Sequence, residues 1–327
     1  MIKVGIVGLG YWGPNLLRNF YNHPLASVKS ICDIDGEKVA KYLKQYPNVQ
    51  DGTVYFQEFL KKDLDLVVIA TPPETHYELC KLAIESGRSV LVEKPFTTSV
   101  KQCEDLINLS ERKNLKIFVD HTFAFNPSVR KIKEVINKGE LGKIIYFDSE
   151  RVRGLYSKAV NVIWDLAVHD FSILIYLGYD IKVKEVLSGK LYGGRREDMA
   201  HITFTTDDSI IGHIYVNWFS PVKIRKMIIG GSDKILWWDD VHPFEKLRIY
   251  ESSGDDLKRD DNPFFPTYIA GDIRILKIDN KESLAIEVDS IVRSIMENSE
   301  PEAGKFEGLK VVRLLEECDM ILQMNTK

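Results

Sequence analysis

Short apolar runs alternate with amphipathic stretches over about the first 120 residues of the chain. The run 64–70 is almost continuously apolar, which is typical of a strand buried on both faces of a parallel sheet. The alternation of such runs with helical patterns predicts an α/β fold with a doubly wound parallel sheet. Strands are predicted at 3–7, 28–32, 64–70, 89–92 and 116–120, and helices at 15–21, 74–86 and 100–114.

The pattern changes after His121, so we predict one domain over residues 1–121 and a second over 122–327. Consecutive strands joined by hairpin-like turns indicate an open, largely antiparallel sheet in the second domain. Its face is expected to carry Trp218, Trp237 and Trp238 as a possible subunit contact, although tryptophans also fill cores. Strands are predicted at 144–153, 184–190, 200–205, 210–218, 224–229, 235–238 and 247–250, helices at 127–139, 164–178, 284–298 and 306–324, and a loop at 254–271.

The composition narrows the class of protein. A net charge of −4 over 327 residues, without a basic block, argues against a nucleic-acid partner. The sequence has no run long enough to span a bilayer and enters its first strand at once, so we expect no membrane contact and no signal peptide. The four cysteines are scattered and none forms a C-x-x-C, so we expect neither a zinc site nor a disulfide framework, and a cytoplasmic location is favoured.

A glycine-rich turn, Gly8 to Gly13, follows the first strand. Gly8 allows the tight turn, Gly10 lets the backbone approach a pyrophosphate, and Gly13 lets the next helix lie close to the sheet. Tyr11 and Trp12 lie in the same turn and are candidate cofactor contacts. The turn predicts a dinucleotide held at the N-terminus of a helix.

Asp33 ends the second strand, about 20 residues after the last glycine, where the fingerprint places the residue that binds the adenosine ribose. Its carboxylate would accept hydrogen bonds from the ribose hydroxyls and repel a 2′-phosphate. The prediction is therefore NAD rather than NADP. The alternative is that Asp33 serves only in a turn.

Two further strand ends should line the same crevice, because ligands of open α/β sheets bind beyond the carboxyl ends of the strands. These segments supply the other candidate cofactor contacts, which are Thr71, Pro72, Pro73, His76, Glu93 and Lys94. The ammonium of Lys94 could hydrogen-bond a substrate hydroxyl and stabilise alkoxide character as a hydride leaves. The alternative is an ordinary solvated lysine.

Asp165 and His169 form a second candidate cluster. They are four residues apart, so on an α-helix they share a face. Histidine can take a hydroxyl proton near neutral pH, and a nearby carboxylate can orient it. The alternative is a structural histidine together with an aspartate that favours the start of a helix. The cluster lacks a third ligand at a convincing spacing, so no metal is predicted.

These signals, in this order, resemble the glucose–fructose oxidoreductase, inositol dehydrogenase and MocA (Gfo/Idh/MocA) family. The resemblance covers essentially the whole chain, and Glu93-Lys94-Pro95 is its most specific motif. It implies a Rossmann domain followed by an α/β domain with an open mixed sheet, commonly used for homodimer or homotetramer contacts. It also implies NAD(P)-linked chemistry on a secondary alcohol, with Lys94 and His169 as the catalytic pair and Asp165 placing the substrate or His169.

Three segments resemble the sugar-nucleotide 3-dehydrogenases of this family, namely 119–123, 125–127 and 161–165. They add His121 and Trp164 as candidate cofactor contacts. Many family members carry Tyr-Asn-Arg-Arg after the sixth strand, whereas this chain has His121, which disfavours a free polyol substrate. Candidate contacts to sugar hydroxyls or a diphosphate, which could equally be ordinary exposed polar residues, are Asn126, Arg151, Arg153, Tyr156 and Asn161.

The sequence therefore predicts oxidation of a secondary hydroxyl, at C3, of a sugar nucleotide such as a UDP-N-acetylated hexose. Lys94, Asp165 and His169 would also contact this substrate. One alternative is a myo-inositol or free-sugar dehydrogenase on the same scaffold. A second alternative, from another class of protein, is a non-catalytic NAD-binding regulator, which need not retain a proton-transfer set.

Overall fold

The computed structural model describes residues 1–153, 159–191, 196–251 and 271–325. The chain forms two compact units. Unit 1 comprises Met1–Phe125 and Lys281–Arg313, and unit 2 comprises Asn126–Asn280 and Leu314–Lys327. The sequence pattern placed 281–313 in the second domain, whereas these residues belong to the first compact unit. None of the described helices is long and apolar enough to cross a bilayer.

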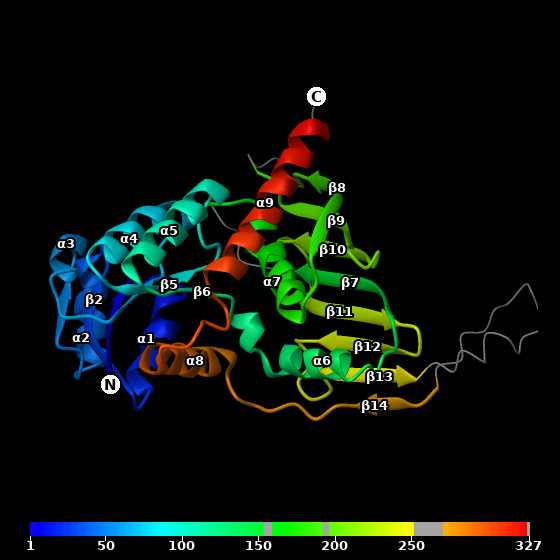
Figure 1. Cartoon of the computed structure of the whole chain (residues 1–327), viewed down its shortest axis with the longest axis horizontal. Coiled ribbons are helices and arrows are strands. Elements are labelled where there is room, and N and C mark those ends of the chain that lie inside the picture. Colours follow the sequence, from blue (N-terminus) through cyan, green and yellow to red (C-terminus); the bar gives the residue numbers. More distant parts are fainter. Residues whose placement is uncertain (154–158, 192–195, 252–270, 326–327) are drawn as a thin grey trace, which may run out of the picture. The chain divides into compact units, whose positions relative to one another are not determined.

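Unit 1 is built on a parallel six-stranded sheet in the order β3-β2-β1-β4-β5-β6. Helices α4 and α5 lie on one side of this sheet, and α1 and α8 lie on the other (Figure 1). Its elements are β1 Ile2–Val7, α1 Gly13–Asn22, β2 Ala26–Cys32, α2 Gly36–Gln45, β3 Asp51–Thr53, α3 Phe56–Phe59, β4 Leu66–Ile69, α4 Pro73–Glu85, β5 Ser89–Glu93, α5 Val100–Lys113, β6 Ile117–Asp120, the 3-10 turn η1 Thr122–Phe125, α8 Ser283–Glu297 and the start of α9 Lys305–Asn325.

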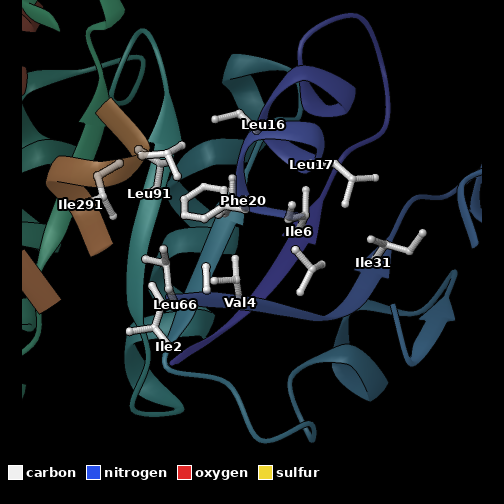
Figure 2. Packing of buried hydrophobic residues seen from close by; sticks show 14 of the residues in the cluster. Ile2, Val4, Ile6, Leu16, Leu17, Phe20, Ile31, Leu66, Leu91 and Ile291 are labelled. Atoms are coloured by element: carbon white, nitrogen blue, oxygen red, sulfur yellow. The ribbon is translucent and has the colours of Figure 1, made fainter. Parts of the chain in front are cut away.

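The core of unit 1 explains why the C-terminal segment returns to it. Apolar residues of β1 and α1, including Ile6 and Phe20, share one buried cluster with Leu91 of β5. Val288 and Ile291 of α8 are buried in the same cluster (Figure 2). Helix α8 therefore covers apolar surface of the sheet that the first 125 residues alone do not bury.

Unit 2 contains a mixed eight-stranded sheet in the order β14-β13-β12-β11-β7-β10-β9-β8. Strands β7 and β10 pair in parallel, and the other neighbours pair antiparallel. Its elements are α6 Pro127–Asn137, β7 Ile144–Val152, the π-helical turn η2 Ile163–Ala167, α7 Val168–Leu177, β8 Ile181–Gly189, β9 Met199–Thr206, β10 Ile211–Asn217, β11 Ile224–Gly231, β12 Lys234–Asp239, β13 Leu247–Glu251 and β14 Ile273–Ile275.

Alternate residues of the unit 2 strands are buried, as expected for a sheet with one covered and one open face. In β9, Ala200 and Ile202 are buried while His201 between them is exposed. The expectation that three tryptophans share the open face was wrong, because Trp218 and Trp238 are buried. Consecutive residues of a strand point to opposite faces, so Trp237 and Trp238 cannot both face outward.

The pattern-based fold class is confirmed, including the change from a parallel to a largely antiparallel sheet. The elements that the pattern missed are short or polar, and they are α2, β3, α3, η1 and β14. Most of the predicted loop at 254–271 lies outside the described residues.

The buried position of Phe20 gives a direct test of the unit 1 core. Phe20→Ala should lower the free energy of unfolding by about 3–5 kcal/mol, because truncation of a buried aromatic residue leaves a cavity. Phe244→Ala is the matched control, since Phe244 is 87% exposed and should change stability little. Urea unfolding of both variants measures the difference, and equal losses would contradict the assigned core.

Candidate functional site

The glycine-rich turn has the tight geometry that its sequence predicts. Gly8 has φ +90°, a conformation that glycine adopts at no steric cost. A Cβ on Gly13 would lie 1.9 Å from the carbonyl oxygen of Gly8, whereas a Cβ on Gly10 would meet nothing within 4 Å. Helix α1 then starts without a side-chain cap at Trp12. An open backbone surface beside an uncapped helix N-terminus suits a pyrophosphate.

Asp33 connects this turn to the end of β2. Its Oδ2 accepts a hydrogen bond from the Leu9 amide at 2.6 Å, and its Oδ1 accepts one from the Asp35 amide at 2.9 Å. The Lys38 ammonium lies 4.0 Å from Oδ1. Asp33 thus acts as a turn residue and still has acceptor capacity on both oxygens, so the turn role and ribose binding are compatible.

His76 joins the loops that follow β4 and β5. Its Nε2 lies 2.9 Å from the Thr71 carbonyl oxygen, and its Nδ1 lies 2.9 Å from that of Pro95. The side chain is fully buried, and burial lowers its pKa. A neutral ring donates to only one of these oxygens. The structure gives His76 a positioning role between the two loops, and direct contact with a cofactor stays a prediction.

Lys94 follows β5 directly and is half-buried. Its charge interacts with the carboxyl of Glu93 and with the ring of His121. His121 is 2% exposed, and among the described residues neither ring nitrogen has a hydrogen-bond partner. Burial is the main cause that lowers the pKa of His121 to about 4, with the charge of Lys94 acting in the same direction. His121 is therefore a neutral ring near neutral pH, with a donor and an acceptor to offer a ligand.

A buried carboxyl cluster lies beside Lys94 and His121. Reasoning from the sequence missed this cluster. We define it as Glu93, Asp120 and Glu287. Asp120 and Glu287 are each 1% exposed, and Glu93 pairs with Asp120 across β5 and β6. The Trp12 indole donates to Asp120 Oδ2 at 2.8 Å, and the Thr122 hydroxyl donates to Oδ1.

Burial raises the pKa of Glu93 and that of Glu287 well above the ordinary value, and the nearby Asp120 carboxylate raises both further. Glu93 was named from sequence for cofactor contact, but its carboxyl faces this cluster. Glu287 comes from a C-terminal helix far away in the sequence. The sequence signal for Glu287 is that a charged residue stands at a position of α8 where the helical pattern calls for an apolar one.

In unit 2, Asp165 and His169 lie on two kinds of helix. Asp165 belongs to the π-helical turn η2, whereas His169 is in the first turn of α7. The α-helical spacing assumed from sequence therefore does not describe this segment, and π turns are frequent at functional sites. The Asp165 Oδ2 accepts a hydrogen bond from the Trp218 indole at 2.9 Å. Both Asp165 and His169 are half-buried.

Asn161 and Trp164 fix the start of this segment. The Asn161 Oδ1 accepts hydrogen bonds from the amides of Ile163 and Trp164, each at 3.1 Å. The Trp164 indole donates to Asp319 Oδ2 at 2.7 Å. Desolvation raises the pKa of Asp319. Hydrogen bonds from the Trp164 indole and the Asn161 side-chain amide partly offset this increase. These contacts are structural, and the predicted roles of Asn161 in substrate binding and Trp164 in cofactor binding remain predictions.

Arg151 holds the beginning of α7. It is 3% exposed, and its guanidinium donates to Asp170 from Nε at 2.8 Å and from Nη2 at 3.1 Å. The Ser149 hydroxyl also donates to Asp170, at 2.7 Å. Because Asp170 follows His169 directly, this buried network fixes the backbone that carries the histidine. Arg151 is thus placed as a support of His169, and its predicted contact with substrate stays a prediction.

The remaining candidate substrate contacts differ in setting. Asn126 caps α6, since its Oδ1 accepts from the Ser128 amide at 2.8 Å. Arg153 is exposed, with its Nη1 3.4 Å from the Pro221 carbonyl oxygen. Tyr156 lies outside the described residues. Within the ranges that the structure describes, the His, Cys, Asp and Glu side chains form no group of three or more that could hold a metal ion.

The two units and their motifs define a class of oxidoreductase with a Rossmann unit and a separate mixed-sheet unit. Residues 2–121 match the model of the oxidoreductase family with an NAD-binding Rossmann fold, and 129–236 match the GFO/IDH/MocA C-terminal domain. The chain belongs to the Gfo/Idh/MocA oxidoreductase family. This confirms the resemblance inferred from the sequence.

Similar proteins include the UDP-N-acetylglucosamine 3-dehydrogenase from Acidithiobacillus ferrooxidans, 21% identical over 251 residues, which are 76% of this chain and 77% of that protein. A crystal structure of it has a TM-score of 0.83 at 19% identity and covers 98% of this chain and 97% of its own. The first curated relative matched is aligned over only 56% of its length, and the next two over 33% and 32%.

Two liganded structures share the fold. The WlbA dehydrogenase from Bordetella pertussis, in complex with NADH and UDP-GlcNAcA, has a TM-score of 0.82 at 16% identity, over 99% of this chain and 96% of that one. A 3-ketoreductase from Actinomadura kijaniata, in complex with TDP-benzene and NADP, has a TM-score of 0.82 at 17% identity, over 98% and 97%. At these identities the likeness shows the fold alone.

The buried ion pair of unit 2 yields a stability test. Arg151→Met should lower the free energy of unfolding by about 3–5 kcal/mol, because it leaves the Asp170 carboxylate buried without its cation. Arg153→Met is the matched control, since Arg153 is exposed. Thermal or urea unfolding measures both variants. A loss no larger than that of the control would show that the pair does not hold α7.

Proposed function

We propose that this chain is an NAD-dependent dehydrogenase that oxidises a secondary hydroxyl, at C3, of a UDP-linked N-acetylated sugar. One observation carries the proposed dehydrogenase activity. A chain that matches both domain models of the family has the glycine-rich turn of a Rossmann fold together with Lys94, Asp165 and His169. The relatives whose names include UDP sugars support the substrate class.

The cofactor part of the proposal rests on the geometry of unit 1. Gly10 leaves open space beside an uncapped α1, and the Asp33 carboxylate closes the neighbouring strand. NAD⁺ would supply the hydride acceptor. His121 is buried, and in the part of the chain that the structure describes its ring nitrogens have no hydrogen-bond partner, so the ring offers a donor and an acceptor that a bound ligand can satisfy.

In the proposed reaction, His169 accepts the proton of the sugar hydroxyl at a ring nitrogen. Lys94 hydrogen-bonds the same oxygen and stabilises its developing charge. The C–H bonding electrons would leave the sugar carbon as hydride for bound NAD⁺ to accept, and the alcohol would become a ketone. Lys94 belongs to unit 1 and His169 to unit 2, and their joint action on one hydroxyl is part of the proposal.

Lys94→Ala and His169→Ala should each lower kcat by roughly 10²-fold or more, because each removes a group that acts in the transition state. The affinity for NADH should change little in both variants. Lys101→Ala, at an exposed lysine of α5, is the control. Steady-state kinetics with NADH absorbance measure the effect, and a fully active variant would remove that residue from the proposed mechanism.

A panel of UDP-GlcNAc, UDP-GlcNAcA, myo-inositol and glucose tests the substrate class. NADH formation with a UDP sugar supports the proposal, whereas turnover of only myo-inositol or glucose would identify a free-polyol or free-sugar dehydrogenase. Tight NADH binding without turnover of any member would favour a non-catalytic regulator.

Asp33 tests the proposed cofactor preference. The kcat/KM ratio of NAD to NADP should exceed one in the native chain and fall by about 10-fold in Asp33→Ala, because the carboxylate binds ribose hydroxyls and repels a 2′-phosphate. Lys38 stands 4.0 Å from Asp33 and could favour that phosphate, so Lys38→Ala should raise the ratio. A native chain that prefers NADP would overturn this assignment.

A further inference from the structure

We propose that Glu287 is a positioning residue for dinucleotide binding, which acts through Asp120 and Trp12 on the glycine-rich turn. The inference deepens the proposed function and rests on its cofactor part. Glu287 lies on α8, a helix that follows residues Asn126–Asn280 of unit 2 in the sequence and returns to unit 1.

The first step of the argument concerns the protonation of the carboxyl cluster. If all its members were ionised, Glu93 Oε1 and Glu287 Oε2 would be shielded from solvent without any hydrogen-bond partner. As neutral acids, Glu93 and Glu287 each have a side-chain hydrogen bond to Asp120, and burial raises the pKa of both toward that state. The burial of Glu93 and Glu287 against Asp120 therefore favours the neutral forms of these two glutamates.

The second step concerns the acceptor sites of Asp120. A carboxylate offers about four lone-pair positions. Trp12 and Thr122 donate to two of them, although Thr122 also contacts Glu287, and neutral Glu93 and Glu287 each carry one proton that can be donated to another. Asp120 is 1% exposed, so water does not readily replace a missing donor, and loss of Glu287 would leave a buried acceptor less well satisfied.

The third step links the cluster to the turn. Trp12 lies between Gly10 and Gly13 and is the N-cap residue of α1, and its indole donates to Asp120 at 2.8 Å. On the other side, Glu93 Oε2 accepts a hydrogen bond from the Lys94 amide at 3.2 Å. The cluster thus connects the turn that would hold the pyrophosphate to the residue that would contact the substrate oxygen.

The groups around Glu287 are few. Asp120 and Thr122 face it from the end of β6 and from η1, and Glu93, Lys94 and His121 complete the same charge cluster. Glu282, which precedes α8, pairs with Arg18, and Asp289 of α8 pairs with His23. Ionisation of Glu287 at high pH would remove its donor to Asp120 and place a negative charge beside that carboxyl.

Two substitutions separate the donor from the charge. Glu287→Gln keeps a side-chain donor toward Asp120 and cannot ionise, so it should bind NADH within about twofold of the native chain. Glu287→Met removes the donor at similar volume and should weaken NADH binding by roughly 10-fold, a change of about 1.4 kcal/mol. Ser294→Ala is the matched control, since it removes one hydrogen bond, to Ser299, from a buried site on the same helix.

The readouts are fluorescence titrations of NADH without any sugar, from neutral to alkaline pH. Burial raises the pKa of Glu287, so native affinity should fall as rising pH ionises it, and Glu287→Gln should flatten this fall. In a Trp12→Phe background, Glu287→Met should have little further effect, because the link is already absent. A protein that binds no NADH would contradict the proposed cofactor. Three outcomes would overturn this inference while leaving the proposed cofactor intact. They are an unchanged NADH affinity in Glu287→Met, losses of affinity that add in the double variant with Trp12→Phe, and a pH profile of Glu287→Gln that runs parallel to the native one.

Should Glu287→Met not fold, the comparison of Glu287→Gln with the native chain decides the question by its pH profile. A flatter profile supports the positioning role, and a parallel profile contradicts it. A purely structural Glu287 would shift the unfolding midpoint without changing the pH dependence of NADH affinity.

Discussion

The register of the parallel sheet in unit 1 is the constraint on which the site depends. Val7 pairs with Cys32 on one side and with Ile69 on the other, Ile69 pairs with Val92, and Glu93 pairs with Asp120. Because the strands end level with each other, the segments that follow them emerge at one edge. The glycine-rich turn, Asp33, Lys94 and His121 are neighbours for this reason, although more than a hundred residues separate the first from the last.

Much of this arrangement could be predicted from sequence because it follows from local rules. A buried parallel strand needs a continuous apolar run, and the turn at Gly8 to Gly13 needs residues without a Cβ. Lys94 could be identified as a candidate because it stands at the carboxyl end of a strand, where ligands of such sheets bind, and is followed by a proline. The first strands, the helices after them and the change of sheet type in unit 2 all followed from such patterns.

The remainder depends on contacts between distant parts of the chain, which periodicity does not encode. The contact of Glu287 with Asp120 follows only from the fold, which brings α8 back to the end of β6. The sequence names Arg151 as a candidate substrate contact, and only the fold shows that its side chain is buried and pairs with Asp170. The π-helical turn before His169 likewise left no signal in the spacing of its residues.

The return of residues 281–313 to unit 1 has a consequence for how the protein is made. A ribosome releases the chain from its N-terminus, so the first 125 residues emerge long before the helix that covers part of their apolar core. Until α8 arrives, that sheet has uncovered apolar surface while unit 2 forms behind it. Completion of the nucleotide-binding unit thereby waits until residues 126–280 of unit 2 have been synthesised, and a chain that stops before α8 would lack the helix that covers this core.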